Sequence, residues 1–382
     1  MAVTDKRRAW ACIDLSALQA NLALVEVLSP GRGKVAVIKA DAYGHGIARV
    51  AMALQRQLGP RDYFAVASLD EAELLRELGV DRRLLLLPGF IDQDELDYVL
   101  STGIEPVLHS PYQVDLLRRG LERAAPAVPV NVWLKLDSGM HRLGMSEDEF
   151  PVAFTELTAA TGIGDVVMMS HLACADDETD PSGMTARQLA RFERLHTKLS
   201  LEHGGDIPAS VAASAGILRL PASHYQYLRP GIMLYGGSPL IGHTGFELGL
   251  RPVMTLRSRL LAIKDVQAGE CIGYGATHTF DKNTRVGIVS IGYGDGYPRS
   301  APNGTPVMVR DGSELRRTRM IGRVSMDMIT IDLDETPHAE VGGEVVLWGE
   351  GLSVDEVATA CGTISHELFC QLTGRMIFDY VG

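Results

Sequence analysis

Lys39 ends a short run of apolar, mostly β-branched residues, and it is the clearest indication of chemistry in this chain. The run 35–38 is typical of a buried parallel strand, which would bring one amine to the mouth of a sheet. Loss of water lowers the pKa of a lysine toward the range in which its amine is a nucleophile. Tyr43, Gly44 and Gly46 follow, offering a hydroxyl donor and room for the backbone to approach a ligand. A lysine after a strand is more often a solvated loop residue, so this pattern alone leaves both interpretations open.

The elements that would position this lysine alternate along the first two-thirds of the chain. Eight apolar runs are predicted as strands, at 35–38, 63–67, 84–87, 105–108, 128–136, 165–169, 210–213 and 226–229. Amphipathic segments with helical spacing lie between most of them, for example 48–58, 69–78, 111–121 and 186–202. This alternation favours an α/β fold with a (β/α)8 barrel of the TIM type over an open doubly wound sheet, which gives a similar pattern.

The pattern changes after about residue 242. Strand-like segments separated by glycine, proline and aspartate turns occur at 254–266, 285–291, 305–309, 328–333 and 344–348. Helical spacing returns only near 354–360 and 365–372. We therefore expect two domains, a barrel in 1–242 and a mainly β domain in 243–382.

In a (β/α)8 enzyme the active site forms at the C-terminal ends of the barrel strands. The polar side chains expected at those ends are Lys39, His109, Lys135, Arg142, His171, Ser214 and Arg229. The loops after the last two strands commonly hold a phosphate, and here they contain Ser214-Ala215-Gly216 and Arg229-Pro230-Gly231-Ile232. Small residues there free backbone N–H groups for an anion. A reactive lysine and a phosphate site on one rim indicate a phosphorylated carbonyl ligand bound as a Schiff base.

Composition and charge restrict the classes of function. The 382 residues carry a net charge of −12, which argues against a nucleic acid or an anionic membrane as partner. The five cysteines lack the paired spacing of a metal site or a disulfide framework, as in a cytoplasmic protein. No apolar run approaches the roughly 20 residues of a membrane span. The basic residues 6–8 are followed by Asp14, which interrupts the apolar run that a signal peptide requires.

Seven segments resemble, in the same order, those of bacterial alanine racemases, which are pyridoxal-phosphate enzymes of fold type III. These segments are 35–46, 133–144, 169–171, 229–236, 273–275, 291–299 and 322–328. Each is only modestly specific, but together they span nearly the whole chain. The resemblance implies pyridoxal 5'-phosphate as cofactor, a small amino acid as substrate, and a homodimer with shared active sites.

The resemblance assigns the cofactor to residues of the barrel rim. Lys39 would bind it as a Schiff base, and the groups holding its phosphate would be Tyr43, Ser214, Gly231 and Ile232. Arg229 would face the pyridine nitrogen. Because a guanidinium keeps its proton, this nitrogen would stay unprotonated. A protonated ring is a stronger electron sink, so this arginine should suppress side reactions such as transamination.

Racemisation removes a proton from one face of Cα and returns it to the other, for which two bases are the economical solution. By resemblance Lys39 serves one face, and Tyr274, from the β domain of the second subunit, serves the other. A tyrosine with a pKa of about 10 is a poor base. The resemblance supplies His171 and Arg229 as a hydrogen-bonded chain from Tyr274 toward the ring.

The resemblance also assigns the substrate carboxylate. Arg142 and Met326 would orient it, Met326 through its backbone and from the partner subunit. Lys135 resembles a family lysine that is often carbamylated and positions Arg142. As an unmodified amine it would lie beside a guanidinium without an anion, unless Asp137 serves instead.

Two positions depart from the family pattern. Most relatives have a tyrosine where this chain has His366, and that tyrosine helps to bind phosphate and narrows the inner entrance. Histidine still donates a hydrogen bond but is smaller and titrates, so we expect a looser pocket that admits serine beside alanine. Ala213 replaces the more usual asparagine, which affects the hydrogen bonding expected around Arg229.

Other functions remain open from the sequence. A Schiff-base aldolase on the same barrel would not explain Arg229 or Tyr274. A pyridoxal-phosphate decarboxylase of related fold uses a cysteine-containing motif for the second base, where this chain has Gly273-Tyr274-Gly275. A non-catalytic pyridoxal-phosphate carrier of the barrel type would lack residues 243–382. The pathway also stays open: the D-amino acid fits cell-wall precursor synthesis, and the enzyme fits the breakdown of alanine as well.

Overall fold

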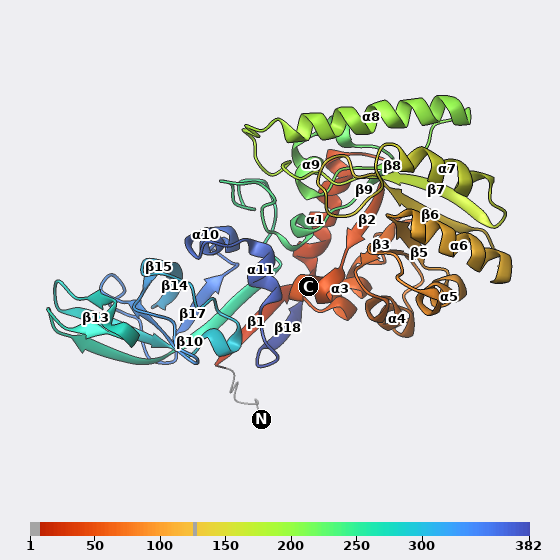
Figure 1. The fold of residues 1–382 in the computed structure, drawn as a ribbon. Helices are drawn as coiled ribbons and strands as arrows, with labels where there is room; N and C mark the ends of the chain where they lie inside the picture. Colours follow the sequence, from red (N-terminus) through yellow and green to blue (C-terminus); the bar gives the residue numbers. More distant parts are fainter. Residues whose placement is uncertain (1–7, 125–127) are drawn as a thin grey trace.

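The computed structural model describes residues 8–124 and 128–382, which form a barrel and a mainly β domain (Figure 1). Lys6 and Arg7, part of the basic segment considered as a targeting signal, lie outside the described residues. None of the helices in the described ranges is long and apolar enough to cross a membrane.

The barrel consists of the eight strands that the sequence predicts. They are β2 (Gly33–Val37), β3 (Tyr63–Val66), β4 (Arg83–Leu86), β5 (Glu105–Leu108), β6 (Val130–Lys135), β7 (Ile163–Met169), β8 (Ala209–Ser210) and β9 (Tyr227–Leu228). All neighbours pair in parallel in the order β8-β7-β6-β5-β4-β3-β2-β9. A bridge between Ala213 and Arg229 closes the ring. The predicted (β/α)8 barrel is therefore confirmed, although its last two strands are only two residues long.

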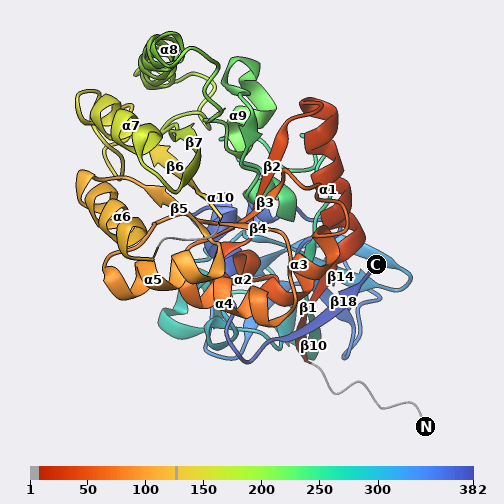
Figure 2. The ribbon, with the colours of Figure 1, turned by 90° about the vertical axis from the view of Figure 1, so that its right-hand side faces the viewer.

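Helices cover the outside of this sheet, several of them in an arc along one side of the molecule (Figure 2). They are α1 (Leu15–Leu28), α3 (Ile47–Leu54), α4 (Leu69–Glu77), α5 (Gln93–Thr102), α6 (Pro111–Ala124), α7 (Glu149–Ala159), α8 (Met184–His203) and α9 (Ser214–Arg219). Side-chain caps define where some of them begin: Ser68 accepts from Glu71 N at α4, and Asp92 accepts from Glu95 N at α5. Fixed helix starts also fix the loops at the mouth of the barrel.

The β domain is built on one eight-stranded sheet. Its strands from the C-terminal part are β10 (Met254–Val266), β13 (Thr284–Val289), β14 (Pro306–Asp311), β15 (Glu314–Ile321), β16 (Ile329–Asp332), β17 (Glu344–Trp348) and β18 (Ile377–Val381). A small hairpin of β11 (Cys271–Ile272) and β12 (His278–Thr279) projects from it. Two helices, α10 (Val354–Ala360) and α11 (Ser365–Cys370), lie on the side of the domain that meets the barrel (Figure 1).

The first strand of the chain, β1 (Ala9–Asp14), belongs to this second sheet. It pairs antiparallel with β10 and parallel with β18. The predicted barrel domain started at residue 1, but β1 lies in the sheet of the β domain. The boundary at 242 stays a prediction. The partners of β1 lie at distant points of the chain, so no local pattern indicated the pairing.

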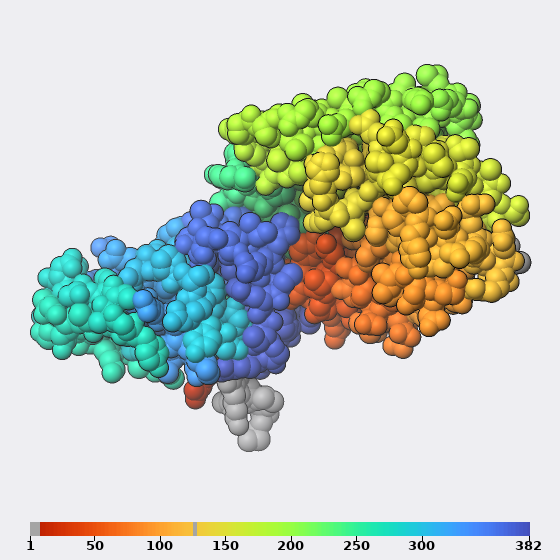
Figure 3. Space-filling view, viewed as in Figure 1, coloured from red at the N-terminus to blue at the C-terminus, as the bar shows by residue number. Residues whose placement is uncertain are grey.

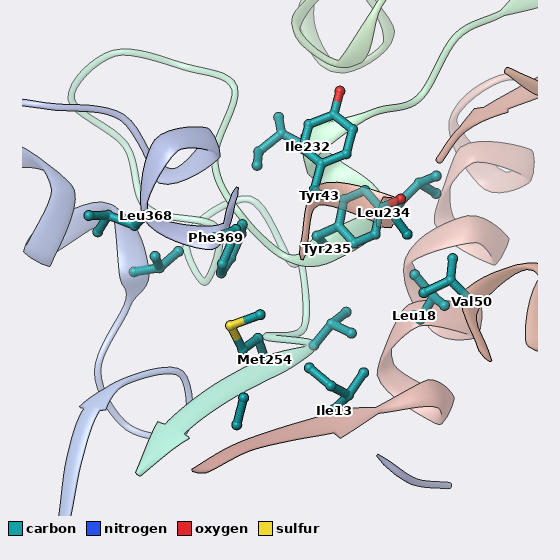
Figure 4. Close-up of a cluster of buried hydrophobic side chains, with 14 of the residues drawn as sticks. Ile13, Leu18, Tyr43, Val50, Ile232, Leu234, Tyr235, Met254, Leu368 and Phe369 are labelled. Atoms are coloured by element: carbon teal, nitrogen blue, oxygen red, sulfur yellow. The ribbon is translucent and has the colours of Figure 1, made fainter. Parts of the chain in front are cut away.

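A continuous apolar core joins the two domains. It includes Ile13 of β1, Leu18 of α1, Met254 of β10 and Phe369 of α11, which lie around the same interior (Figure 4). In the space-filling view, red residues near the start of the chain lie between the blue C-terminal residues and the orange helices of the barrel (Figure 3). This shared core fixes α11 against the mouth of the barrel.

A buried polar network closes the opposite, N-terminal end of the barrel. The Glu105 carboxylate accepts hydrogen bonds from Tyr63 Oη (2.9 Å) and Trp133 Nε1 (3.3 Å). It also forms an ion pair with Arg83 Nη2 at 2.6 Å. Glu105 is 6% exposed, so its partners replace the water that burial removes. Because Tyr63, Arg83 and Glu105 each begin a strand, the network ties β3, β4 and β5 together.

Glu105→Leu should destabilise the barrel by about 3 kcal/mol, because it leaves the half-buried Arg83 without its counter-ion. Urea unfolding would show this as a lower midpoint. The double variant Glu105→Leu/Arg83→Met should recover part of the loss, since replacing both partners removes the unpaired charge. A double variant less stable than Glu105→Leu would contradict this account.

Candidate active site

One large cavity lies at the C-terminal ends of the barrel strands, with a volume of about 1460 Å³. It is lined by barrel residues and by residues of α10 and α11 in the β domain. The predicted site residues that line it are Lys39, Tyr43, Lys135, Arg142, His171, Ser214, Arg229, Gly231, Ile232 and His366. His109 does not line it; its ring nitrogen Nε2 lies 3.1 Å from the Pro88 carbonyl oxygen. Tyr274 and Met326 also lie outside the cavity lining.

Lys39 begins a turn, α2 (Lys39–Gly44), with an unusual backbone. The four residues Ala40–Tyr43 all have positive φ, between 51° and 55°, so the turn is left-handed without a glycine at any of these positions. Such a conformation costs about 1–2 kcal/mol for each residue with a side chain. Two hydrogen bonds help to hold it: Ala40 N donates to Glu71 Oε1 (2.6 Å), and Ile47 N donates to Asp41 Oδ1 (2.7 Å). This turn could not be predicted from the sequence, because local preference at these residues is for right-handed backbone.

The Lys39 side chain is partly buried and lies near other positively charged side chains. Burial first, and then the charge of Arg142, lower the pKa of Lys39, while Glu71 partly opposes the shift. A lowered pKa increases the fraction of neutral amine, which is the form that attacks a carbonyl or accepts a proton. The structure thus gives Lys39 the environment that its position in the sequence suggested.

Three residues surround a space beside this turn that suits a phosphate. The Tyr43 hydroxyl and Ser214 Oγ both face Gly231, where an added Cβ would lie 2.8 Å from Tyr43 Oη and 3.8 Å from Ser214 Oγ. Ser214 Oγ also accepts from Gly231 N at 2.9 Å. An anion is bound by hydroxyl groups and by backbone N–H groups that a glycine leaves accessible. The two hydroxyls, Gly231 and the start of the short helix η2 (Ile232–Tyr235) supply such groups. These residues therefore fit the phosphate group of pyridoxal phosphate.

Arg229 is buried, with 3% exposure, yet its terminal nitrogens contact only neutral acceptors within the described residues. Nη1 donates to Ser210 Oγ (2.6 Å), and Nη2 donates to the carbonyl oxygens of Ser170 (2.6 Å) and Val211 (3.1 Å). Burial lowers the pKa of Arg229 to about 10, so it still carries its proton at neutral pH. The cavity therefore has a permanent donor on this wall.

His171 lies against this guanidinium. Arg229 Nη2 donates to its Nδ1 at 3.2 Å, which places the ring proton on Nε2 when the imidazole is neutral. Burial, followed by the charge of Arg229, lowers the pKa of His171 to about 3. His171 is therefore neutral at physiological pH. The predicted contact between His171 and Arg229 is present.

Lys135 is buried beside Arg142 and Arg229. Burial, then the charges of Arg229 and Arg142, lower the pKa of Lys135 to about 8. Asp137 is not its ion-pair partner, because that carboxylate accepts from Gly139 N (2.9 Å), His141 N (3.0 Å) and His141 Nδ1 (3.0 Å). Within the described ranges, no carboxylate lies within ion-pair distance of Lys135.

His366 reaches the cavity from α11 of the β domain. Its ring lies 5.7 Å from that of Tyr43, and burial, then Lys39, lower its pKa. The preceding Ser365 donates to Asp355, a buried carboxylate that also accepts from Ser238 N and Gly245 N. Sequence analysis missed Asp355; its position at the start of a helix was the available signal.

Tyr274 and Met326 lie on the surface of the β domain, 70% and 53% exposed. Tyr274 begins the short helix η3 (Tyr274–Ala276), between the two strands of the β11–β12 hairpin. Gly294 N donates to the Met326 carbonyl oxygen (2.8 Å), which fixes that loop. The structure of one chain therefore brings together ten of the twelve residues that the resemblance assigns to the site and leaves these two apart.

The sequence and the fold match known proteins over nearly the full length of the chain. The family models "Alanine racemase, N-terminal domain" and "Alanine racemase, C-terminal domain" match residues 13–239 and 253–380. The alanine racemase of Halorhodospira halophila is 45% identical over 97% of each chain. The crystal structure of the biosynthetic alanine racemase of Pseudomonas aeruginosa has a TM-score of 0.89 and 43% identity, covering 98% of this chain and 100% of the other.

A third relative has its cofactor in place. It is the crystal structure of alanine racemase from Bartonella henselae with covalently bound pyridoxal phosphate, at a TM-score of 0.84 and 28% identity, covering 98% of this chain and 100% of that one. The resemblance expected from the sequence motifs is confirmed. This chain belongs to the alanine racemase family, whose members are enzymes of the isomerase class.

Proposed function

We propose that this chain interconverts L- and D-alanine with pyridoxal 5'-phosphate as cofactor, using two bases contributed by different subunits of a homodimer. The observation that carries the proposal is the division of the site. One cavity holds Lys39 with its lowered pKa, the anion cradle (Tyr43, Ser214 and Gly231, which suit a phosphate) and Arg229. Tyr274 lies exposed on the other domain. The relative from Bartonella henselae, with its covalently bound pyridoxal phosphate, supports the choice of cofactor.

The residues of the cavity divide the work of holding the cofactor. Lys39 would bind it covalently, and the phosphate would be held by Tyr43, Ser214, Gly231, Ile232 and, in place of the usual tyrosine, His366. When bound, pyridoxal phosphate supplies an electron sink that acidifies the Cα proton of an amino acid. Arg229 keeps its proton and would donate a hydrogen bond toward the ring nitrogen, so that nitrogen would receive no proton from the protein.

Proton transfer at Cα requires a base on each face. The Lys39 amine takes or returns the proton on one face, which its lowered pKa favours. Tyr274 of the second subunit does so on the other face. His171, neutral and fixed by Arg229, has its Nε2 proton available for a hydrogen bond to that phenol. A donor to the phenolate oxygen makes tyrosine easier to deprotonate.

The substrate carboxylate would be oriented by Arg142 and by the backbone of Met326 from the second subunit. Carbamylation of Lys135 would supply the anion that holds Arg142. The neutral amine adds to carbon dioxide, releases one proton and leaves a carbamate. The lowered pKa of Lys135 favours the reactive neutral form, and Asp137 is occupied elsewhere.

A shared site can be tested with mixed dimers carrying two affinity tags. Lys39→Ala and Tyr274→Phe dimers should each lose racemase activity by about 100-fold or more, because each lacks one base. A mixed dimer of the two variants should have about half of wild-type activity, since one of its two sites keeps both bases. The matched control pairs wild type with the double variant Lys39→Ala/Tyr274→Phe and should be inactive. The opposite pattern, with the control active, would place both bases in one chain.

Carbamylation of Lys135 can be measured by NMR with 13C-labelled bicarbonate. A carbamate signal should grow as the pH rises from about 6 to about 9, because the amine loses its proton near its lowered pKa. Lys135→Arg, which keeps the charge but cannot form the carbamate, should lack the signal and show a raised KM for alanine. A signal that persists in Lys135→Arg would assign the modification to another lysine.

Broader specificity follows from His366, which is smaller than the tyrosine of most relatives. His366→Tyr should lower kcat/KM for L-serine relative to L-alanine by about tenfold, because filling the pocket excludes the larger substrate. His366→Phe separates ring size from hydrogen bonding. Unchanged preference in both variants would refute the proposed role of this position. A wild type that binds pyridoxal phosphate covalently without racemising either amino acid would indicate a carrier.

A further inference from the structure

The turn that contains Lys39 is followed by a histidine with no assigned role. His45 is fully buried, and it comes two residues after the left-handed segment Ala40–Tyr43. Lys39 and Tyr43 lie near the two ends of this turn, so its conformation sets the distance between the Lys39 amine and the anion cradle. A left-handed segment of four residues with side chains reverts to other conformations unless its surroundings hold it.

His45 holds the end of this turn through its side chain. Its Nδ1 lies 2.8 Å from the carbonyl oxygen of Tyr43. A carbonyl oxygen only accepts, so the ring proton must be on Nδ1. Burial lowers the pKa of His45 to about 4, and the ring is therefore neutral at physiological pH with no proton on Nε2.

That Nε2 atom is buried and has no hydrogen-bond partner in the part of the chain that the structure describes. A buried acceptor without a donor is unfavourable, and an apolar residue of similar size would avoid the cost. The feature that an apolar residue lacks is the N–H group on the other side of the ring. The histidine therefore serves the Tyr43 carbonyl rather than the packing of the core.

The His45 ring also supports Tyr43 indirectly. It lies 4.6 Å from the ring of Tyr235 and meets the edge of Phe369 at 4.8 Å. Tyr235 in turn stacks on Tyr43 at 4.8 Å, and the three labelled aromatic residues lie close together (Figure 4). Phe369 comes from α11, so the β domain closes the far side of this arrangement.

We propose that His45 is a positioning residue for the cofactor, which acts by donating its Nδ1–H to the Tyr43 carbonyl and thereby holding the left-handed turn. The inference rests on the proposed function, because it takes Lys39 and Tyr43 as cofactor ligands. His45 itself does not line the cavity, so it would act through Tyr43 rather than by contact with substrate or cofactor.

Asparagine and leucine at position 45 separate hydrogen bonding from packing. The two side chains have nearly the same size, so both leave a similar space, but only His45→Asn keeps a donor bonded to Cγ at the level of Nδ1. The cofactor would be released from each protein with hydroxylamine and titrated back. His45→Leu should bind pyridoxal phosphate about tenfold more weakly than His45→Asn, a ratio equivalent to about 1.4 kcal/mol. The melting temperatures of the two cofactor-free variants show whether each variant still folds.

Equal affinities of His45→Asn and His45→Leu for pyridoxal phosphate would overturn the proposal. If His45→Leu does not fold, His45→Gln replaces it in the comparison. Glutamine carries its amide one carbon farther from the backbone, at the level of Nε2, where it cannot replace the Nδ1 donor. The His45→Gln variant should therefore bind the cofactor as weakly as expected for His45→Leu. Failure of wild type to form a borohydride-reducible absorption band in the same titration would instead refute the proposed function.

Discussion

The chemistry of this site depends on positive charge gathered around one cavity, where Lys135 and Arg229 are buried, Lys39 is partly buried and Arg142 is exposed. Lys39, Lys135, Arg142 and Arg229 line one cavity, and no carboxylate in residues 8–124 and 128–382 lies within ion-pair distance of Lys135. Burial and the neighbouring charges lower the pKa of both lysines and keep His171 neutral. Buried positive charge is unfavourable until anions offset it. The site is therefore suited to a phosphate, a substrate carboxylate and, by our proposal, a carbamate.

The second constraint is mechanical and comes from the β domain. A side chain at Gly44 would collide with the carbonyl oxygen of Phe369, and one at Gly46 would collide with the Tyr380 hydroxyl. The Lys39 turn is thus enclosed between the barrel and elements of the β domain of the same chain. This enclosure, together with the bond from His45, keeps a conformation that the local sequence does not favour.

These two constraints give the domains different tasks. The barrel mouth supplies the cations and the anion cradle, and α11 closes it with His366. The hairpin and loop that carry Tyr274 and Met326 point to a different surface, where both residues are exposed. Under the proposed function, a second subunit covers that surface and completes the site. A single chain would then bind the cofactor but lack one of the two bases.

The barrel could be predicted from the sequence alone, because alternating apolar runs and amphipathic segments are local patterns typical of strands and helices. The sequence also predicted most of the polar barrel residues that line the cavity, since those residues follow the strands, but it wrongly included His109. The sequence predicted neither the left-handed turn nor the sheet to which β1 belongs, because both depend on segments that are distant in the chain. The turn needs Phe369 and Tyr380 around it, and β1 needs β10 and β18 beside it. The lowered pKa values of Lys39, Lys135 and His171 could be found only from the folded structure, because they follow from burial and neighbouring charge.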